Sequence, residues 1–358
     1  MNHRCLATIG GLISAMALLA PGLLAPGLLA PGLATAQSNT NAATKAPSAA
    51  STVPRMPDGK PDLQGVWDFR TITPLERPRE LGEKAFFTAE EAAAWEKDEN
   101  RRQNRDLIDP ETGGLNYPAG GVVPYNEFWY ERGDKIIGSR RTSLIVDPPD
   151  GRLPAWTPEG KVKADARALT GRETQLGHPK ADSWEDRPLQ ERCIMGLNAG
   201  PPMTPGAYNN NVQLSQTPET VVILTEMVHD ARIVPMDGRP FLNIPQWKGE
   251  SRGRWEGDTL VVETKNFKRE TSLPGSSAST HLIERFTRTD ANTLLYEFTV
   301  TDPTMWTRPW TAVVPMTRSE DPIYEYACHE GNHALAGILA GARADEKAAA
   351  EAAKKGSK

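Results

Sequence analysis

The chain has 358 residues, a formal net charge of -5 at pH 7 and 24% charged residues. Its Lys and Arg residues are scattered singly, which excludes the clustered basic surface typical of nucleic-acid-binding proteins, so we expect no nucleic-acid partner. Outside residues 1–36, no segment is apolar enough to cross a membrane. Length and composition together predict one large domain, or one domain with a loosely packed N-terminal extension.

Residues 1–36 have the three parts of a secretory signal peptide. A basic start ends at Arg4, an uncharged run follows, and a small-x-small cleavage site ends at Ala36. An uncleaved membrane anchor is the alternative, but prolines interrupt the apolar run and would break a membrane helix. We therefore predict a periplasmic or secreted protein that has no membrane contact after cleavage. Residues 37–55 are rich in Ala, Ser, Thr and Asn and predict a flexible leader.

Two cysteines, Cys193 and Cys328, remain after removal of the signal peptide, which contains Cys5. Thiols oxidise in the compartment that this signal predicts. We therefore predict one disulfide between them, which would close a long loop and restrict the unfolded chain.

The N-terminal part, residues 56–218, contains few signals of regular structure. A short strand is predicted at 65–69, and a helix at about 89–106 begins with a capping box formed by Thr88 and Glu91. From 107 onward the chain is rich in Pro, Gly, Asn and Asp, with one convincing strand at 141–146. A loop region of this length is typical of ordered functional loops on a scaffold.

Residues 219–330 predict the core of the fold, an antiparallel β-meander. Short β-rich runs follow one another with turn residues between them. The runs are 220–234, 252–256, 259–267, 281–289, 293–302, 309–317 and 323–329. Together with the two earlier strands they predict a mainly β protein, folded as a barrel or a two-sheet sandwich. Residues 331–358 predict a C-terminal helix from about His333 and a tail that frays after Ala344.

The 281–302 hairpin places an acidic side chain on the core-facing side of the sheet. A three-residue turn at 290–292 puts Glu284 opposite Phe298 and on the same face as Tyr296. A carboxyl group buried in this way must be paired, hydrogen-bonded or catalytic. Burial would raise its pKa toward that of a general acid. The alternative is an ion pair between Glu284 and an arginine of a neighbouring strand.

Other polar residues lie close to this hairpin in the predicted meander. The run 220–234 contains acidic, basic and imidazole groups. Either a catalytic role or ion pairing at the end of the strand would explain them. Arginines in the neighbouring runs could bind an anionic or carbonyl group. The candidates are Glu226, His229, Asp230, Arg232, Arg252, Arg254, Trp255, His281, Tyr296 and Asp302. They predict a polar mouth on an apolar, aromatic-lined pocket.

The sequence His329-Glu330-Gly331-Asn332-His333 matches the HExxH signature of zinc peptidases. In that signature both histidines lie on one face of a helix. Here 323–328 alternates like a strand and Asn332 is a natural N-cap, so the two histidines are expected to straddle a strand-to-helix corner. A zinc hydrolase with His329 and His333 as ligands is therefore kept as an alternative to a protein without metal or other cofactor.

Several long strings between about 140 and 345 carry a resemblance. They include RRTSLIVDPPDGRLPAWTPEG, MVHDARIVPMDGRP, ESRGRWEGDTLVVETKNF and YEYACHEGN. They resemble a large group of exported bacterial proteins for which no activity is established. The start Gly65-Val66-Trp67 followed by a meander also resembles calycin-type barrels in a generic way.

These observations predict an exported protein that holds a small organic molecule in a β-barrel pocket. The preferred function is an enzyme with cofactor-independent acid–base chemistry, a lyase, isomerase or hydrolase. In it Glu284 is the acid or base, His229 or His281 the proton partner with Asp230 beside it, and the arginines orient the substrate. The alternative is a periplasmic binding protein with the same pocket and no turnover. The sequence leaves the oligomeric state open.

Overall fold

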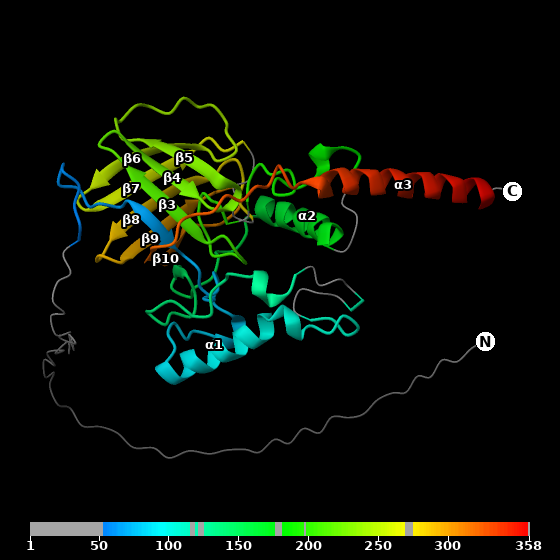
Figure 1. Ribbon diagram of the computed structural model, residues 1–358, viewed down its shortest axis with the longest axis horizontal. Helices are drawn as coiled ribbons and strands as arrows, with labels where there is room; N and C mark the ends of the chain where they lie inside the picture. The colour runs from blue at the N-terminus through cyan, green and yellow to red at the C-terminus, as the bar shows by residue number, and fades with distance from the viewer. Residues whose placement is uncertain are drawn as a thin grey trace, which may run out of the picture. The chain divides into compact units, whose positions relative to one another are not determined.

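The structure, a computed structural model, describes residues 53–114, 119–120, 125–175, 181–196, 198–268 and 275–356 (Figure 1). The predicted signal peptide lies outside these residues, as does the predicted leader up to residue 52. In the part of the chain that is described, no helix is long and apolar enough to cross a membrane.

The described part of the chain is mainly β, as the sequence predicts, and its ten strands form one antiparallel sheet. The strands are β1 (Gly65–Asp68), β2 (Ile145–Asp147), β3 (Asn211–Gln216), β4 (Thr220–Thr225), β5 (Asp230–Pro235), β6 (Glu250–Glu256), β7 (Thr259–Lys265), β8 (His281–Arg288), β9 (Thr293–Thr301) and β10 (Trp310–Ser319). Their order is β5-β4-β3-β1-β10-β9-β8-β7-β6, and β2 pairs with β10. The early strand β1 therefore joins two meanders, β3–β5 and β6–β10, through its pairing with β3 and β10.

Alternating burial along each strand builds the core on the inner face of the sheet. In β8 and β9 every second residue is buried, and Glu284 lies opposite Phe298, so the predicted register of this hairpin is confirmed. The inner face carries large side chains such as Trp67 and Trp310, both fully buried. They pack into one continuous hydrophobic cluster with residues of all the long strands.

Three segments differ from the sequence prediction. The run 220–234 is a hairpin rather than one strand, because β4 ends at Thr225 and a 3-10 turn, η5 (Met227–His229), precedes β5. The backbone at Val228 and His229 has positive φ angles of 64° and 41°, which no period-2 pattern anticipates. The predicted strand at 323–329 is not formed, and the one at 141–146 is reduced to β2.

The helices are α1 (Ala89–Gln103), α2 (Pro158–Gln175) and α3 (His333–Gly356), with further 3-10 turns η1 (Arg79–Leu81), η2 (Arg105–Leu107), η3 (Glu127–Trp129) and η4 (Trp184–Asp186). The capping box at Thr88 and Glu91 is confirmed, whereas α2 and β3 were not predicted. α1 packs through Ala92 on a small cluster that includes Phe87 and Ile136. This cluster is separate from the core of the sheet.

The sheet curls until its two edge strands, β5 and β6, are in contact, although they do not pair in the sheet order of the described strands. Gly253 of β6 makes this approach feasible. A Cβ atom at position 253 would lie 2.2 Å from the Met236 sulfur and 2.9 Å from Val234 Cγ1. The seam between β5 and β6 is thus held by side-chain packing, for which residue 253 must be small.

We predict that Gly253→Ala lowers the free energy of unfolding by about 1–3 kcal/mol, because the added methyl group overpacks the seam. Gly138→Ala is the matched control, since nothing lies within 4 Å of a Cβ placed there. Urea denaturation of both variants measures the effect. Equal stability of the two variants would contradict a closely packed seam.

Candidate functional site

Glu284 lies at the centre of a hydrogen-bonded network inside the curled sheet. The guanidinium of Arg232 donates to both carboxylate oxygens, with distances of 2.6 Å to Oε2 and 2.9 Å to Oε1. The Tyr296 hydroxyl donates to Oε1 at 2.7 Å and accepts the backbone N–H of Met203 at 3.1 Å. Arg232 comes from β5 and Glu284 from β8, so the ion pair joins an edge strand to the opposite part of the sheet.

The electrostatics of this network favour fixed protonation states for its two other members. Burial and the nearby Glu284 carboxylate raise the pKa of Tyr296 well above its ordinary value, so the hydroxyl stays a neutral donor. For Arg232, burial alone would lower the pKa, but Glu284 outweighs it and the pKa is raised. The geometry is that of a bidentate arginine–carboxylate pair, which matches the ion-pair interpretation of Glu284 rather than the acid–base one.

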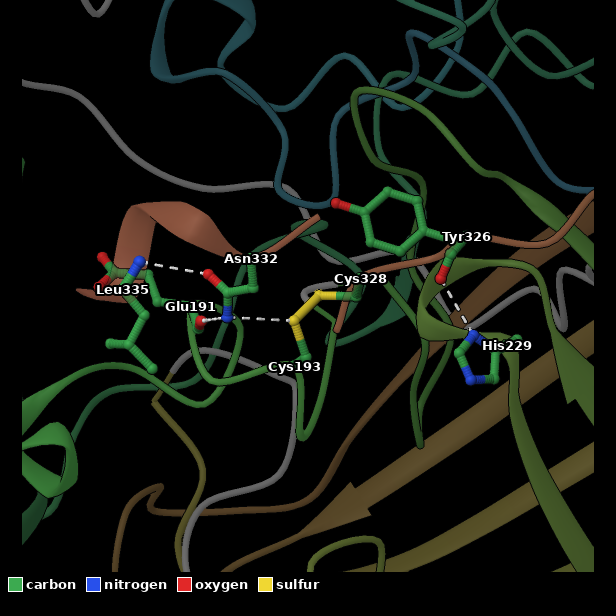
Figure 2. Close-up of a disulfide and its surroundings, with 7 residues drawn as sticks. All are labelled: Glu191, Cys193, His229, Tyr326, Cys328, Asn332 and Leu335. Carbon is green, nitrogen blue, oxygen red and sulfur yellow. Dashed lines mark hydrogen bonds between the residues drawn. A yellow bond between two sulfur atoms is a disulfide. The ribbon is translucent and has the colours of Figure 1, made fainter. Parts of the chain in front are cut away.

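The two histidines predicted as proton partners lie elsewhere. His229 is exposed, and its Nδ1 lies 3.0 Å from the carbonyl oxygen of Tyr326 (Figure 2). His281 lies on the face of β8 opposite to Glu284, and its Nε2 is 2.9 Å from Glu263 Oε1. Glu284, His229 and His281 therefore point to three separate places, and they do not surround a common point at which a substrate could react.

The predicted substrate-binding arginines Arg252 and Arg254 are engaged with acids of their own strand. Arg252 pairs with Glu250 and also donates to backbone carbonyls of the 239–240 turn. Arg254 donates to Glu256 at 2.7 Å in an exposed pair. Trp255 packs against the rim of the main core and is only partly buried. Arg252 and Arg254 therefore pair within β6, whereas Glu284 pairs with Arg232.

Asp302, another candidate residue of the predicted pocket, accepts hydrogen bonds from neighbouring residues of the fold. Its carboxylate accepts the backbone N–H and hydroxyl of Ser277 at 2.8 and 2.7 Å. It also accepts the hydroxyls of Thr280 at 3.0 Å and Thr304 at 2.8 Å. Only 2% of Asp302 is exposed. Asp302 thus fixes the entry to β8 relative to the turn after β9.

The HExxH sequence does not form the zinc-peptidase geometry. His329 lies in a turn, whereas His333 is the first residue of α3. The predicted N-cap is present, because Asn332 Oδ1 accepts the backbone N–H of Leu335 at 3.3 Å. The histidines therefore do not share a helix face. Within the described residues, no group of three or more His, Cys, Asp or Glu side chains is placed to hold a metal ion.

The predicted disulfide between Cys193 and Cys328 is present, with the two cysteines 135 positions apart in the sequence (Figure 2). It joins the loop before β3 to the segment that leads into α3. Asn332 strengthens the same junction by donating to the Glu191 carbonyl at 2.7 Å. Tyr326 stacks on Tyr208, with ring centroids 6.5 Å apart. The start of α3 is thus fixed to the body of the protein by covalent and polar contacts.

A cleft with a volume of about 340 Å³ lies outside the sheet interior. Five stretches of the chain line it: the extended segment 71–75, the end of α1 with η2, Arg132, Leu144, and the loop 204–207. The lining residues are Thr71, Ile72, Thr73, Pro74, Leu75, Glu99, Gln103, Arg105, Arg132, Leu144, Thr204, Pro205, Gly206 and Ala207. The predicted site residues are not among them.

Two guanidinium groups give the cleft its chemical character. Arg105 and Arg132 both lie against the ring of Tyr130, at 5.4 and 4.6 Å from its centroid. Glu127 helps to position them, because it pairs with Arg132 and accepts the backbone N–H of Arg105 at 2.9 Å. Apolar groups, including Leu75 and Leu144, form the rest of the wall. This combination suits a small organic ligand with an anionic group.

The sequence reasoning missed this cleft because its lining residues come from five separate stretches of the chain. The only signal that could have indicated it is the long loop-rich region, which we interpreted as functional without naming residues.

Comparison with known proteins gives no match, whether with family models, curated proteins or solved structures. The resemblance to exported bacterial proteins therefore stays a prediction.

Asp230, the remaining predicted catalytic residue, pairs with Lys248 across the seam between β5 and β6. Burial lowers the pKa of Lys248 from 10.5 to about 8, and Asp230 opposes this effect without cancelling it. Between these two pH values the unfolded chain binds a proton that the folded protein has released. The contribution of Lys248 to stability therefore rises with pH across this window.

We predict that wild type gains unfolding free energy relative to Lys248→Met as the pH rises from 8 to 10.5. The increase is on the order of 3 kcal/mol, at 1.36 kcal/mol per pKa unit. Urea denaturation at several pH values gives the measurement, and Lys265→Met, which removes an exposed lysine of β7, is the matched control. A difference that does not change over this range, or that falls, would refute the lowered pKa.

Proposed function

We propose that the protein is exported and binds a small organic molecule with an anionic group in the cleft between α1, segment 71–75 and loop 204–207. The observation that carries this proposal is a cleft whose lining includes two arginines and several apolar side chains. Its volume of about 340 Å³ lies within the range of small-molecule sites, roughly 300–1,000 Å³.

Two features support function outside the cytoplasm. The N-terminal 36 residues have the pattern of a signal peptide. The Cys193–Cys328 disulfide is of the kind that persists in an oxidising compartment. The disulfide also ties the loop before β3 to the segment that leads into α3.

Binding without turnover is the better-supported form of the proposal. Acid–base catalysis needs two titratable groups within hydrogen-bond reach of a common point. Among the residues that line the cleft, the one carboxylate is that of Glu99, and its oxygens accept hydrogen bonds from Arg102 and Gln103. The residues that would have formed an acid–base set, Glu284, His229 and His281, lie apart from one another.

A screen of organic carboxylates and phosphates for thermal stabilisation of the oxidised protein tests the proposal. A ligand present at a hundred times its Kd should raise the unfolding free energy by about 2.7 kcal/mol. Ala207→Trp places a large side chain on the cleft wall and should abolish the stabilisation. Ala231→Trp adds the same side chain at an exposed position of β5 and should preserve it.

The proposal fails on either of two results. One is a screen in which no organic anion stabilises the wild-type protein. The other is a set of ligands that stabilise Ala207→Trp as well as they stabilise Ala231→Trp, because these ligands would bind outside the cleft.

A further inference from the structure

Two arginines that do not line the cleft, Arg77 and Arg141, lie near each other, because Arg77 forms a hydrogen bond with Thr142, the residue that follows Arg141. Arg77 is 2% exposed, so its guanidinium is inside the protein. Its Nε donates to the Thr142 hydroxyl at 3.0 Å, and its terminal nitrogen donates to the Pro149 carbonyl at 3.3 Å. Both of these acceptors are neutral, so they do not compensate the charge.

Arg141 has unused hydrogen-bonding capacity. Its terminal nitrogen makes a long contact of 3.4 Å with the carbonyl of Ile145. Its Nε is buried and has no hydrogen-bond partner in the described chain. The guanidinium lies over the ring of Phe86, 5.1 Å from the centroid. An arginine has five N–H donors, and a buried donor without an acceptor is rare in folded proteins.

The two charges repel each other without a counter-ion among the described residues. Burial lowers the pKa of Arg141, and the positive charge of Arg77 lowers it further. The contacts of both guanidiniums are to a hydroxyl, carbonyls and a ring. Arg77 is buried and Arg141 is partly buried, and two neighbouring like charges with reduced access to water are costly unless an anion joins them.

The surrounding backbone holds Arg77 in one orientation. Its N–H donates to the carbonyl of Gly151 at 2.8 Å, which closes the 148–151 turn over the side chain. Gly151 has a φ of +70°, and a Cβ there would lie 2.3 Å from the Ser143 hydroxyl and 3.0 Å from the Arg77 guanidinium. Only glycine suits this position, and the guanidinium is fixed before any ligand arrives.

We propose that Arg77 and Arg141 form a binding site for an oxyanion, the carboxylate, phosphate or sulfate group of a small molecule. An anion placed between the guanidiniums accepts a hydrogen bond from the unpaired Nε–H of Arg141 and removes the repulsion between the two charges. Planar guanidinium groups recognise such oxyanions through paired hydrogen bonds. None of these residues lines the cleft, so this site is independent of the function proposed above.

Thermal unfolding of the oxidised full chain in sodium phosphate, sodium sulfate or sodium acetate, each compared with sodium chloride at equal ionic strength, tests the site. We expect a saturable rise in Tm for the wild type with at least one of the three anions. A rise with phosphate and sulfate alone assigns a tetrahedral ligand group, and a rise with acetate assigns a carboxylate. Arg141→Gln should weaken the apparent affinity for the effective anion at least ten-fold.

Arg140→Gln is the matched control, because it removes the same charge from the neighbouring exposed residue and should leave the rise in Tm unchanged. Arg141 is chosen over Arg77 because it is less deeply buried, so its variant perturbs folding less. Two results overturn the proposal: no anion raises Tm beyond the chloride control, or Arg141→Gln retains the wild-type affinity.

Discussion

The ion pair between Arg232 and Glu284 is the interaction on which the rest of the structure depends. The sheet does not close through backbone hydrogen bonds between β5 and β6, so its edges must be held by other means. The guanidinium of Arg232 extends from β5 to the carboxylate on β8, and Tyr296 on β9 links that carboxylate to the backbone of Met203. An edge strand, the middle of the second meander and the loop before β3 are therefore tied together at one buried point. The charged pair is shielded from water, which makes the loss of either partner costly.

The interior of the curled sheet is filled by side chains, so we propose a ligand site outside it. Aromatic side chains and this network occupy the inner face of the sheet, so the polar residues on which an acid–base mechanism would depend are used for structure. The arginines that line the cleft, and Arg141, lie instead in the segments outside the long strands of the sheet. The disulfide and Asn332 stabilise the loop region from the C-terminal side, and α1 covers it through its own small apolar cluster. In the function that we propose, the sheet is the scaffold and the loops bind the ligand, a common division of roles in β proteins.

Local patterns in the sequence were sufficient for part of this structure. The register of β8 and β9, the capping box at Thr88 and the N-cap at Asn332 follow from short-range rules, and the structure confirms them. The disulfide, also confirmed, follows from the number of cysteines that remain after the predicted signal peptide. The turn at Val228 could not be predicted, because a β-branched residue with positive φ is held by its surroundings and not by its own preference. The partner of Glu284 was predicted as an arginine of a neighbouring strand, whereas the curl of the sheet brings Arg232 from far along the strand order. The cleft also depends on tertiary packing of distant segments, which no local pattern encodes.

A double-mutant cycle on Arg232 and Glu284 tests the central claim that Glu284 serves the fold. Unfolding free energies of Arg232→Met, Glu284→Met and the double variant would be measured by urea denaturation of the oxidised protein. Each single substitution leaves one buried charge without a partner and should cost about 3–5 kcal/mol, whereas the double variant should be more stable than either single variant. If Glu284→Met is within about 1 kcal/mol of wild type, or if the two costs simply add, Glu284 does not hold the curled sheet together.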